Sequence, residues 1–193
     1  MRWLVIENST PQGGLAFGQG NEVRWTAPFV SGRTSGGELL EAMTDLPDQP
    51  EVVVVGIGPG SYSGLRMSLS AGHGLALAWG VSVVGLPSVL GLDWGGFVPE
   101  RYSVIGDAGR RMGFLLTVQS GEVGALKLFP VEEKECQRCD EPLVATQAWK
   151  ACPDLKVVPP IAAELGLAFA KDPERWLSQQ IVEPIYVQGA VAQ

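Results

Sequence analysis

A glycine-rich turn between a valine run and a long apolar segment contains the residues best suited to binding a ligand. The turn runs from Gly56 to Gly60, after Val52–Val55 and directly before Ser61. Backbone N–H groups in such a turn can bind an anion at a helix N-terminus. The dinucleotide motif would need another glycine where Ser61 stands, and no Gly-Lys-Ser/Thr follows. We therefore expect Gly58, Gly60 and Ser61 to be weak candidates for nucleotide contact, at a site shared with a partner protein.

His73 is the only histidine in the chain and the only candidate base for a Ser-His-Asp relay. Such a relay needs an accessible imidazole that a carboxylate orients, whereas His73 lies between Gly72 and Gly74 in the apolar segment. A packing or interface role is the expected one, and no catalytic residue is assigned. A glycoprotease-like peptidase and a nucleotide-binding enzyme stay open as alternative functions.

Two other groups of residues could bind a phosphate or a metal. Glu7, Ser9 and Thr10 follow the first apolar run, and a strand end with a capped turn is the simpler interpretation of them. Cys136 and Cys139 form a Cys-x-x-Cys pair, and Cys152 follows later. A structural zinc would need a fourth ligand that the chain does not offer nearby. We expect free thiols and no bound metal.

The elements around the glycine turn are a strand and a long helix. Four consecutive valines predict a strand that is buried on both faces. The segment from Tyr62 to Trp79 predicts a helix with Ser61 as its N-cap. Arg66 is the one certain charge in that helix. A helix without a polar face is covered on more than one side.

Small residues recur at every fourth position of this segment, where they form a ridge: Gly60, Gly64, Ser68, Gly72 and Ala76. Glycine inside a helix costs about 1 kcal/mol relative to alanine, so a packing reason is expected. We expect the helix of a partner to lie along the ridge, since apolar exposed faces mark interaction sites; a second layer of the chain itself is the alternative. The expected partner interface is Ser61, Tyr62, Gly64, Leu65, Arg66, Ser68, Leu69, Gly72, His73 and Ala76.

The remaining pattern predicts an α/β fold with two lobes, 1–100 and 101–193. The first lobe is expected to contain strands Trp3–Ile6, Leu15–Gly18, Val23–Ala27 and Val81–Leu86 and a helix Ser35–Leu46. The second is expected to contain strands Tyr102–Asp107, Phe114–Val118, Gly124–Pro130 and Lys156–Val158, a loop Glu132–Glu141, and helices Leu143–Lys150 and Ile161–Ala170.

The composition limits the classes of function. Fourteen basic and 21 acidic residues give a net charge of −7, which disfavours direct binding to a phosphate backbone. The mean hydropathy of +0.14 is high and fits a surface that another protein covers. Glu7 interrupts the first apolar run too early for a signal peptide. No membrane span is expected either, because Gly80, Gly85 and Pro87 divide the charge-free stretch from Met67 to Leu92. The expected location is the cytoplasm.

Four segments resemble the TsaB family, also called YeaZ. GIGPGSYSGLRMSLSAGHGLALAWGVSVVGLPSV is similar to its GPGSFTGLR signature with the helix and strand that follow. LVIENST is similar to its opening LAIDTST, GDAGRRMGFLLTV to its DARRGEVYxA hairpin, and VEPIYVQGA to its closing EPxYLR. The similarity is weaker between Pro87 and Tyr102 and between Val131 and Lys156.

The resemblance implies an actin/hexokinase/Hsp70-like (ribonuclease H-like) fold of two lobes, each with a mixed five-stranded sheet. It implies a non-catalytic scaffold in the bacterial modification of tRNA to threonylcarbamoyladenosine. The expected partners are a TsaD-like catalytic subunit, bound through the long helix, and a TsaE-like ATPase. Contact with tRNA would be indirect, and a homodimer would form when the partner is absent. No cofactor is expected on the isolated chain, with ATP or ADP confined to an interface shared with the partner.

The chain departs from the family pattern in three places. Glu7 replaces the opening aspartate, Gly109 is an additional residue in the second-lobe turn, and both lobes are shorter. Leu65 and Arg66 retain the LR pair that follows the glycine turn. The change to Glu7 weakens the case for a phosphate or metal at the first strand end.

Overall fold

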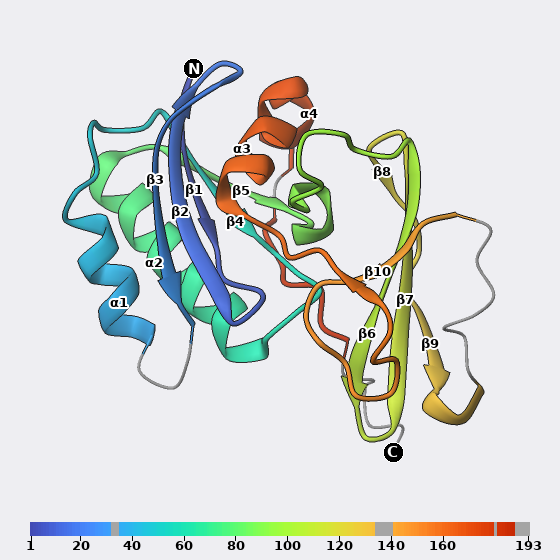
Figure 1. Ribbon diagram of the computed structural model, residues 1–193. Helices are drawn as coiled ribbons and strands as arrows, with labels where there is room; N and C mark the ends of the chain where they lie inside the picture. The colour runs from blue at the N-terminus through green and yellow to red at the C-terminus, as the bar shows by residue number, and fades with distance from the viewer. Residues whose placement is uncertain (32–34, 134–140, 180, 188–193) are drawn as a thin grey trace. The chain divides into compact units, whose positions relative to one another are not determined.

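The computed structural model describes residues 1–31, 35–133, 141–179 and 181–187, and Figure 1 shows their arrangement. The chain forms two compact units, of which the first contains Met1–Leu92 and Pro160–Ile185. The second contains Asp93–Pro159 and the described residues after Ile185. The predicted boundary lay after residue 100, whereas the first unit stops at Leu92. The first unit also includes Pro160–Ile185, a segment that was expected in the second lobe.

The first unit has a five-stranded mixed sheet in the order β3-β2-β1-β4-β5. Strand β1 pairs antiparallel with β2 and parallel with β4, while β5 continues the parallel half. The strands are β1 (Arg2–Glu7), β2 (Gln12–Gln19), β3 (Glu22–Val30), β4 (Val52–Gly56) and β5 (Ser82–Leu86), and the helices are α1 (Ser35–Met43), α2 (Tyr62–Trp79), η1 (Ser88–Gly91), α3 (Ala162–Lys171) and α4 (Pro173–Leu177). The valine run of β4 is completely buried, as predicted.

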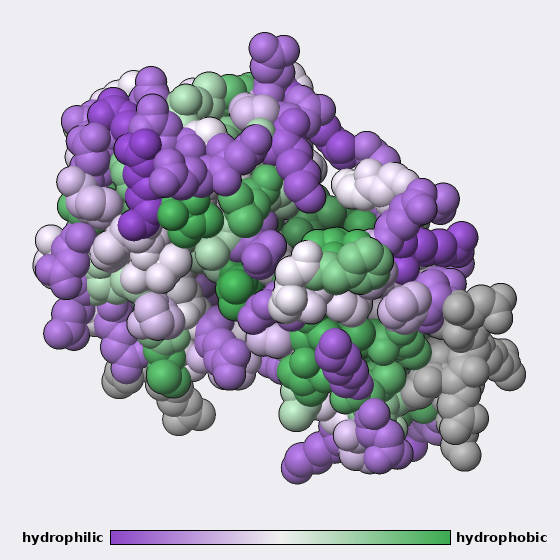
Figure 2. Space-filling model, turned by 45° about the horizontal axis from the view of Figure 1, so that its top comes forward, coloured by the Kyte–Doolittle hydropathy of each residue, from purple (hydrophilic) through white to green (hydrophobic). Residues whose placement is uncertain are grey.

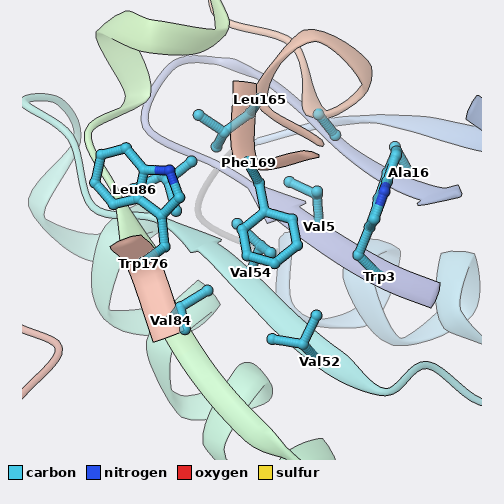
Figure 3. Packing of buried hydrophobic residues seen from close by; sticks show 11 residues of the cluster. Trp3, Val5, Ala16, Val52, Val54, Val84, Leu86, Leu165, Phe169 and Trp176 are labelled. Atoms are coloured by element: carbon cyan, nitrogen blue, oxygen red, sulfur yellow. The ribbon is translucent and has the colours of Figure 1, made fainter. Parts of the chain in front are cut away.

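Helices cover both faces of this sheet, α1 and α2 on one side and α3 and α4 on the other (Figure 1). Alternate residues of the strands point to opposite faces. Ile6, Val53 and Val55 join the core beneath α1 and α2. Figure 3 shows the opposite core, where Phe169 of α3 lies over Val5 and Val54 of the strands and Trp176 of α4 lies beside Leu86. The C-terminal helices therefore complete the first unit.

The second unit has a six-stranded sheet in the order β11-β10-β6-β7-β8, with β9 paired to β7. Its elements are β6 (Arg101–Gly109), β7 (Met112–Gln119), β8 (Glu122–Val123), β9 (Lys127–Pro130), η2 (Val131–Glu133), β10 (Leu143–Ala145) and β11 (Lys156–Val157). Ile105, Phe129 and Trp149 form part of its core. The predicted two-lobed α/β fold is confirmed, although this second sheet has one strand more than the five expected.

One predicted element is wrong in type. A helix was expected over Leu143–Lys150, but no helix forms there, and Leu143–Ala145 is strand β10, which pairs parallel with β6 on one side and with β11 on the other. Pairing within the sheet outweighs the weak local preference of this short segment. Strand β8 and helix α4 were not expected, and the predicted loop Glu132–Glu141 lies mostly outside the described residues.

On the face that Figure 2 shows, hydrophilic residues (purple) surround several apolar patches (green). The most exposed large apolar side chains include Leu77 at 87% and Phe97 at 79%. Within the described ranges, no helix has the length and apolar character that crossing a membrane requires.

Candidate functional site

Helix α2 begins and ends where the sequence predicts. The Ser61 hydroxyl accepts a hydrogen bond from the Gly64 N–H at 3.3 Å, which caps the first turn. Gly80 follows the last turn in the left-handed conformation, with φ 68° and ψ 35°, and its N–H donates to the Ala76 carbonyl. The two ends of the helix are therefore fixed by caps.

The small-residue ridge faces the chain's own sheet, so the expected docking groove along it is wrong. A Cβ at Gly64 would overlap the Asn8 carbonyl oxygen, and one at Gly72 would lie 2.6 Å from Val55 Cγ2. Gly64, Leu65, Ser68, Gly72 and Ala76 are the buried residues of α2. These small residues let β1 and β4 approach closely, which is the alternative left open above. These five residues are buried within the first unit and offer almost no surface to a partner.

The opposite face of α2 is exposed, and we call its residues the outer face: Tyr62, Ser63, Arg66, Ser70, His73, Gly74, Leu77 and Ala78. Leu77 is 87% exposed and Tyr62 is 52% exposed. A Cβ at Gly74 would meet nothing within 4 Å. Packing within the chain therefore does not explain this glycine, although it costs helix stability.

The predicted interface residues thus divide into three groups. Tyr62, Arg66 and His73 lie on the outer face, Ser61 and Leu69 are half-buried, and the remaining five are buried. Sequence reasoning missed Ser63, Ser70, Gly74, Leu77 and Ala78. Most polar residues of this helix lie on one side of it, at positions 62, 66, 70 and 73, and position 77 lies on the same side. Their spacing of three and four residues could therefore have predicted this exposed face from the sequence.

Arg66 and Tyr62 form a polar pair at the start of the outer face. Arg66 Nη1 donates to the Tyr62 hydroxyl at 2.8 Å, and its guanidinium carbon lies 5.2 Å from the centre of the tyrosine ring. The two residues are one turn apart, which suits such a contact. The pair holds a cation and an aromatic ring in a fixed arrangement on the surface.

The glycine turn has few free backbone donors. Ile57 N–H donates to the Leu86 carbonyl, Gly58 N–H to the Ser88 hydroxyl at 3.0 Å, and Ser61 N–H to the Ser9 carbonyl at 2.7 Å. A Cβ at Gly60 would overlap Ser9. The protein itself thus occupies the N–H groups of Gly58 and Ser61, two of the three weak nucleotide candidates.

Glu7 lies beside this turn and is completely buried. Its Oε1 accepts a hydrogen bond from the Ser9 N–H at 2.7 Å. Burial raises the pKa of Glu7, and hydrogen bonds with Ser9 and Ser88 oppose this shift without cancelling it. The side chain packs against Gly56, where a Cβ would overlap its carboxyl group. The expected strand end with a capped turn describes these residues, because the carboxyl group is completely buried and accepts from the N–H of Ser9 in the turn.

Comparison with known proteins agrees with the family suggested by the sequence. Residues 37–125 match the family model TsaD, described as tRNA N6-adenosine threonylcarbamoyltransferase. A Pseudomonas aeruginosa protein described as similar to peptidase YeaZ has 21% identity and a TM-score of 0.73, over 97% of this chain and 99% of that one. YeaZ from Pseudomonas aeruginosa has 20% identity and the same TM-score, over 96% and 99% of the two chains. The predicted resemblance to the TsaB (YeaZ) family is confirmed. No curated protein matches the sequence.

The segment that matches the TsaD model includes the candidate site. It extends from α1 through β4, α2 and β5 to the hairpin of β6 and β7. Within the described residues, no group of three or more His, Cys, Asp or Glu side chains could hold a metal ion. None of the described residues forms a hydrogen bond or an ion pair with His73, so none of them orients its ring.

The second-unit turn of the YeaZ-like pattern is a tight hairpin. Asp107 accepts a hydrogen bond from the Gly109 N–H at 2.7 Å, and Gly109, Arg110 and Arg111 all have positive φ. Arg111 forms an ion pair with Glu132. The additional residue, Gly109, lies in the left-handed region of this turn, which glycine adopts without steric cost.

The expectation of free thiols is wrong for Cys152, which is disulfide-bonded. Cys136 and Cys139 lie outside the described residues, so their predicted state stays a prediction.

Proposed function

We propose that this protein is a non-catalytic scaffold subunit of the tRNA threonylcarbamoyladenosine machinery that binds and activates a TsaD-like transferase. The outer face of α2 is the proposed interface. The observation that carries the proposal is Gly74 beside the exposed Leu77. A glycine that no internal packing explains lets a partner helix approach closely, and a large exposed apolar side chain next to it would be covered by that partner. The similarity to YeaZ in fold and to the TsaD model in sequence supports the choice of partner.

In the absence of the partner, a second copy of the chain is proposed to pair through the same face about a two-fold axis. A TsaE-like ATPase would join the complex, and tRNA would reach this subunit only through its partners. The net charge of −7 supports indirect contact, because a phosphate backbone repels such a chain. The proposed location is the cytoplasm.

No nucleotide is proposed to bind the isolated chain. The internal hydrogen bonds of the glycine turn support this proposal, and ATP or ADP would bind only at an interface shared with the transferase. A peptidase would need a base and an oriented carboxylate. His73 is exposed on α2 and has no such carboxylate recorded beside it in the described residues, which disfavours that alternative.

The test is co-purification of the full chain with a cognate TsaD-like protein, followed by assay of threonylcarbamoyl transfer to tRNA. We expect Leu77→Asp to abolish both the complex and the tRNA product. Phe97→Asp, at a similarly exposed apolar residue of the second unit, is the matched control and should preserve both. An intact complex with Leu77→Asp contradicts the proposed interface. Peptide or ester hydrolysis by the isolated chain, lost in His73→Ala, would favour the enzyme alternative.

A further inference from the structure

The hairpin of β6 and β7 ends in a two-residue turn made of Arg110 and Arg111 (Figure 1). Both residues have positive φ, 53° and 63°. That combination belongs to a type I′ turn, in which asparagine, aspartate and glycine are the usual residues. Arginine is not among them, because in the left-handed region its Cβ lies too close to the following carbonyl oxygen. The geometry of the turn therefore does not explain two arginines in it.

Two other two-residue turns of the described chain are built from small residues. Gly20 and Asn21 join β2 to β3, and Ser120 and Gly121 join β7 to β8. The second of these turns also has positive φ at both positions, 51° and 79°. Residues held in unfavourable backbone conformations cluster at functional sites. The arginines of the β6–β7 turn thus point to a role for their guanidinium groups.

Neighbouring groups hold this turn in place and occupy one of its two arginines. The Arg111 carbonyl accepts a hydrogen bond from the Val131 N–H at 3.0 Å, and the Arg111 guanidinium forms an ion pair with Glu132. The Arg110 side chain is exposed, and none of the described residues forms a hydrogen bond or an ion pair with it. Its guanidinium is therefore available to an anion from outside the chain.

The charges around the turn favour a single carboxylate over a polyanion. Asp107, which accepts from the turn, and Glu132 balance the two arginines, so the turn has no excess of positive charge. Binding to a phosphate backbone depends on such an excess, and the chain as a whole has a net charge of −7. A carboxylate needs only the paired N–H donors that one guanidinium offers, and Arg111 already binds the carboxylate of Glu132.

We propose that this arginine turn binds an aspartate or glutamate side chain of a partner protein. The carboxylate of the partner accepts hydrogen bonds from the guanidinium of Arg110, while the contacts of Arg111 with Val131 and Glu132 keep the turn in position. The turn belongs to the second unit and the outer face of α2 to the first. The proposal therefore does not depend on the proposed function.

The test is titration of the full chain with two peptides of equal length, one with two glutamates and one with glutamines in their place. NMR of the arginine side-chain N–H groups reports on the contact. We expect the glutamate peptide to shift the Arg110 signal and the glutamine peptide to leave it unchanged. A single-stranded RNA hexanucleotide is the third probe and should bind more weakly than the glutamate peptide. No shift with the glutamate peptide, equal shifts with both peptides, or tighter binding of the RNA overturns the proposal.

Variants at residue 110 separate binding from the conformation of the turn. Arg110→Asn removes the guanidinium and suits the left-handed backbone better. It should raise the Tm and weaken binding of the glutamate peptide by roughly tenfold, the effect of one hydrogen bond to a charged group. The peptide affinity is measured from the backbone amide signals of residues 109–112. Ser120→Asn, at a left-handed position of the other turn, is the matched control and should bind the peptide as the wild type does.

Arg110→Lys keeps the charge but lacks the planar pair of donors, so it should weaken binding of the glutamate peptide several-fold. If Arg110→Asn does not fold, Arg110→Lys decides. A lower Tm of Arg110→Asn would show that the arginine serves the turn itself and overturns the proposal. Undiminished peptide binding by a folded variant at residue 110 overturns it as well.

Discussion

The carboxyl group of Glu7 lies directly against the α-carbon of Gly56. A Cβ at residue 56 would overlap Glu7 Oε2 and would lie 2.8 Å from Glu7 Cδ and 2.9 Å from Ser88 Oγ. Glu7 ends β1 and Gly56 ends β4, so the side chain of one strand fills the space that the other leaves empty. The end of the parallel half of this sheet, where related folds commonly bind ligands, is filled from within.

The first prediction concerns this contact. Gly56→Ala should destabilise the protein by about 1–3 kcal/mol, because the added methyl group overpacks a buried site with no free volume. Chemical denaturation measures the change in the free energy of unfolding. The control is Gly74→Ala, where a methyl group meets open space and should stabilise the helix by up to about 1 kcal/mol. Equal effects of the two substitutions would contradict the packing of Glu7 against Gly56.

The second prediction is a pH dependence caused by Glu7. Burial raises the pKa of this carboxyl group in the folded state, so the unfolded chain releases the proton at lower pH. The favourable contribution of protonated Glu7 is complete below the ordinary pKa of glutamate, 4.5. It is lost as the pH rises from there through the folded-state value, by at most about 1.4 kcal/mol per pH unit.

Glu7→Gln removes this titration and keeps an acceptor for the Ser9 N–H. Relative to the wild type, the variant should therefore gain stability as the pH rises from 5 to 8. Urea denaturation of both proteins across that range measures the difference. Parallel pH profiles would show that Glu7 titrates normally in the fold.

The elements with strong local signals could be predicted from the sequence. Ser61 and Gly80 cap the two ends of α2, and the run of four valines in β4 is typical of a strand buried on both faces. Short strands had no comparable signal. Leu143–Ala145 pairs with residues some forty positions earlier in β6, and only that distant partner makes the segment a strand.

The orientation of α2 was harder to predict than its existence. A ridge of Gly64, Ser68 and Gly72 suits close approach by any backbone, and here that backbone belongs to the chain's own sheet. The apolar residues at the flanks of α2 concealed its polar side. Arg66, Ser70 and His73 mark that side, and only the helical period connects them.

The third prediction concerns the contribution of α3 to the first unit. Phe169 is completely buried against strands that precede it by more than a hundred residues (Figure 3). Phe169→Ala should destabilise the protein by about 3–5 kcal/mol, because it leaves a large cavity between α3 and the sheet. Ala168→Gly on the same helix is the control, and should cost about 1 kcal/mol. Similar losses in the two variants would contradict the assignment of α3 to this core.

The last prediction separates the two faces of α2 by a pair of glycines only two residues apart. Gly72→Leu should destabilise the fold, because even a Cβ there lies 2.6 Å from Val55 Cγ2 within a rigid core. Gly74→Leu should fold normally, since its Cβ meets nothing within 4 Å.

The same variant, Gly74→Leu, should weaken binding to a TsaD-like protein at least tenfold, or about 1.4 kcal/mol, because the larger side chain would separate two closely packed helices. Thermal unfolding of the isolated variants and calorimetric titration with the partner measure the two effects. A fully folded Gly74→Leu protein that binds the partner as tightly as the wild type would exclude the outer face as the interface, whatever Gly72→Leu does.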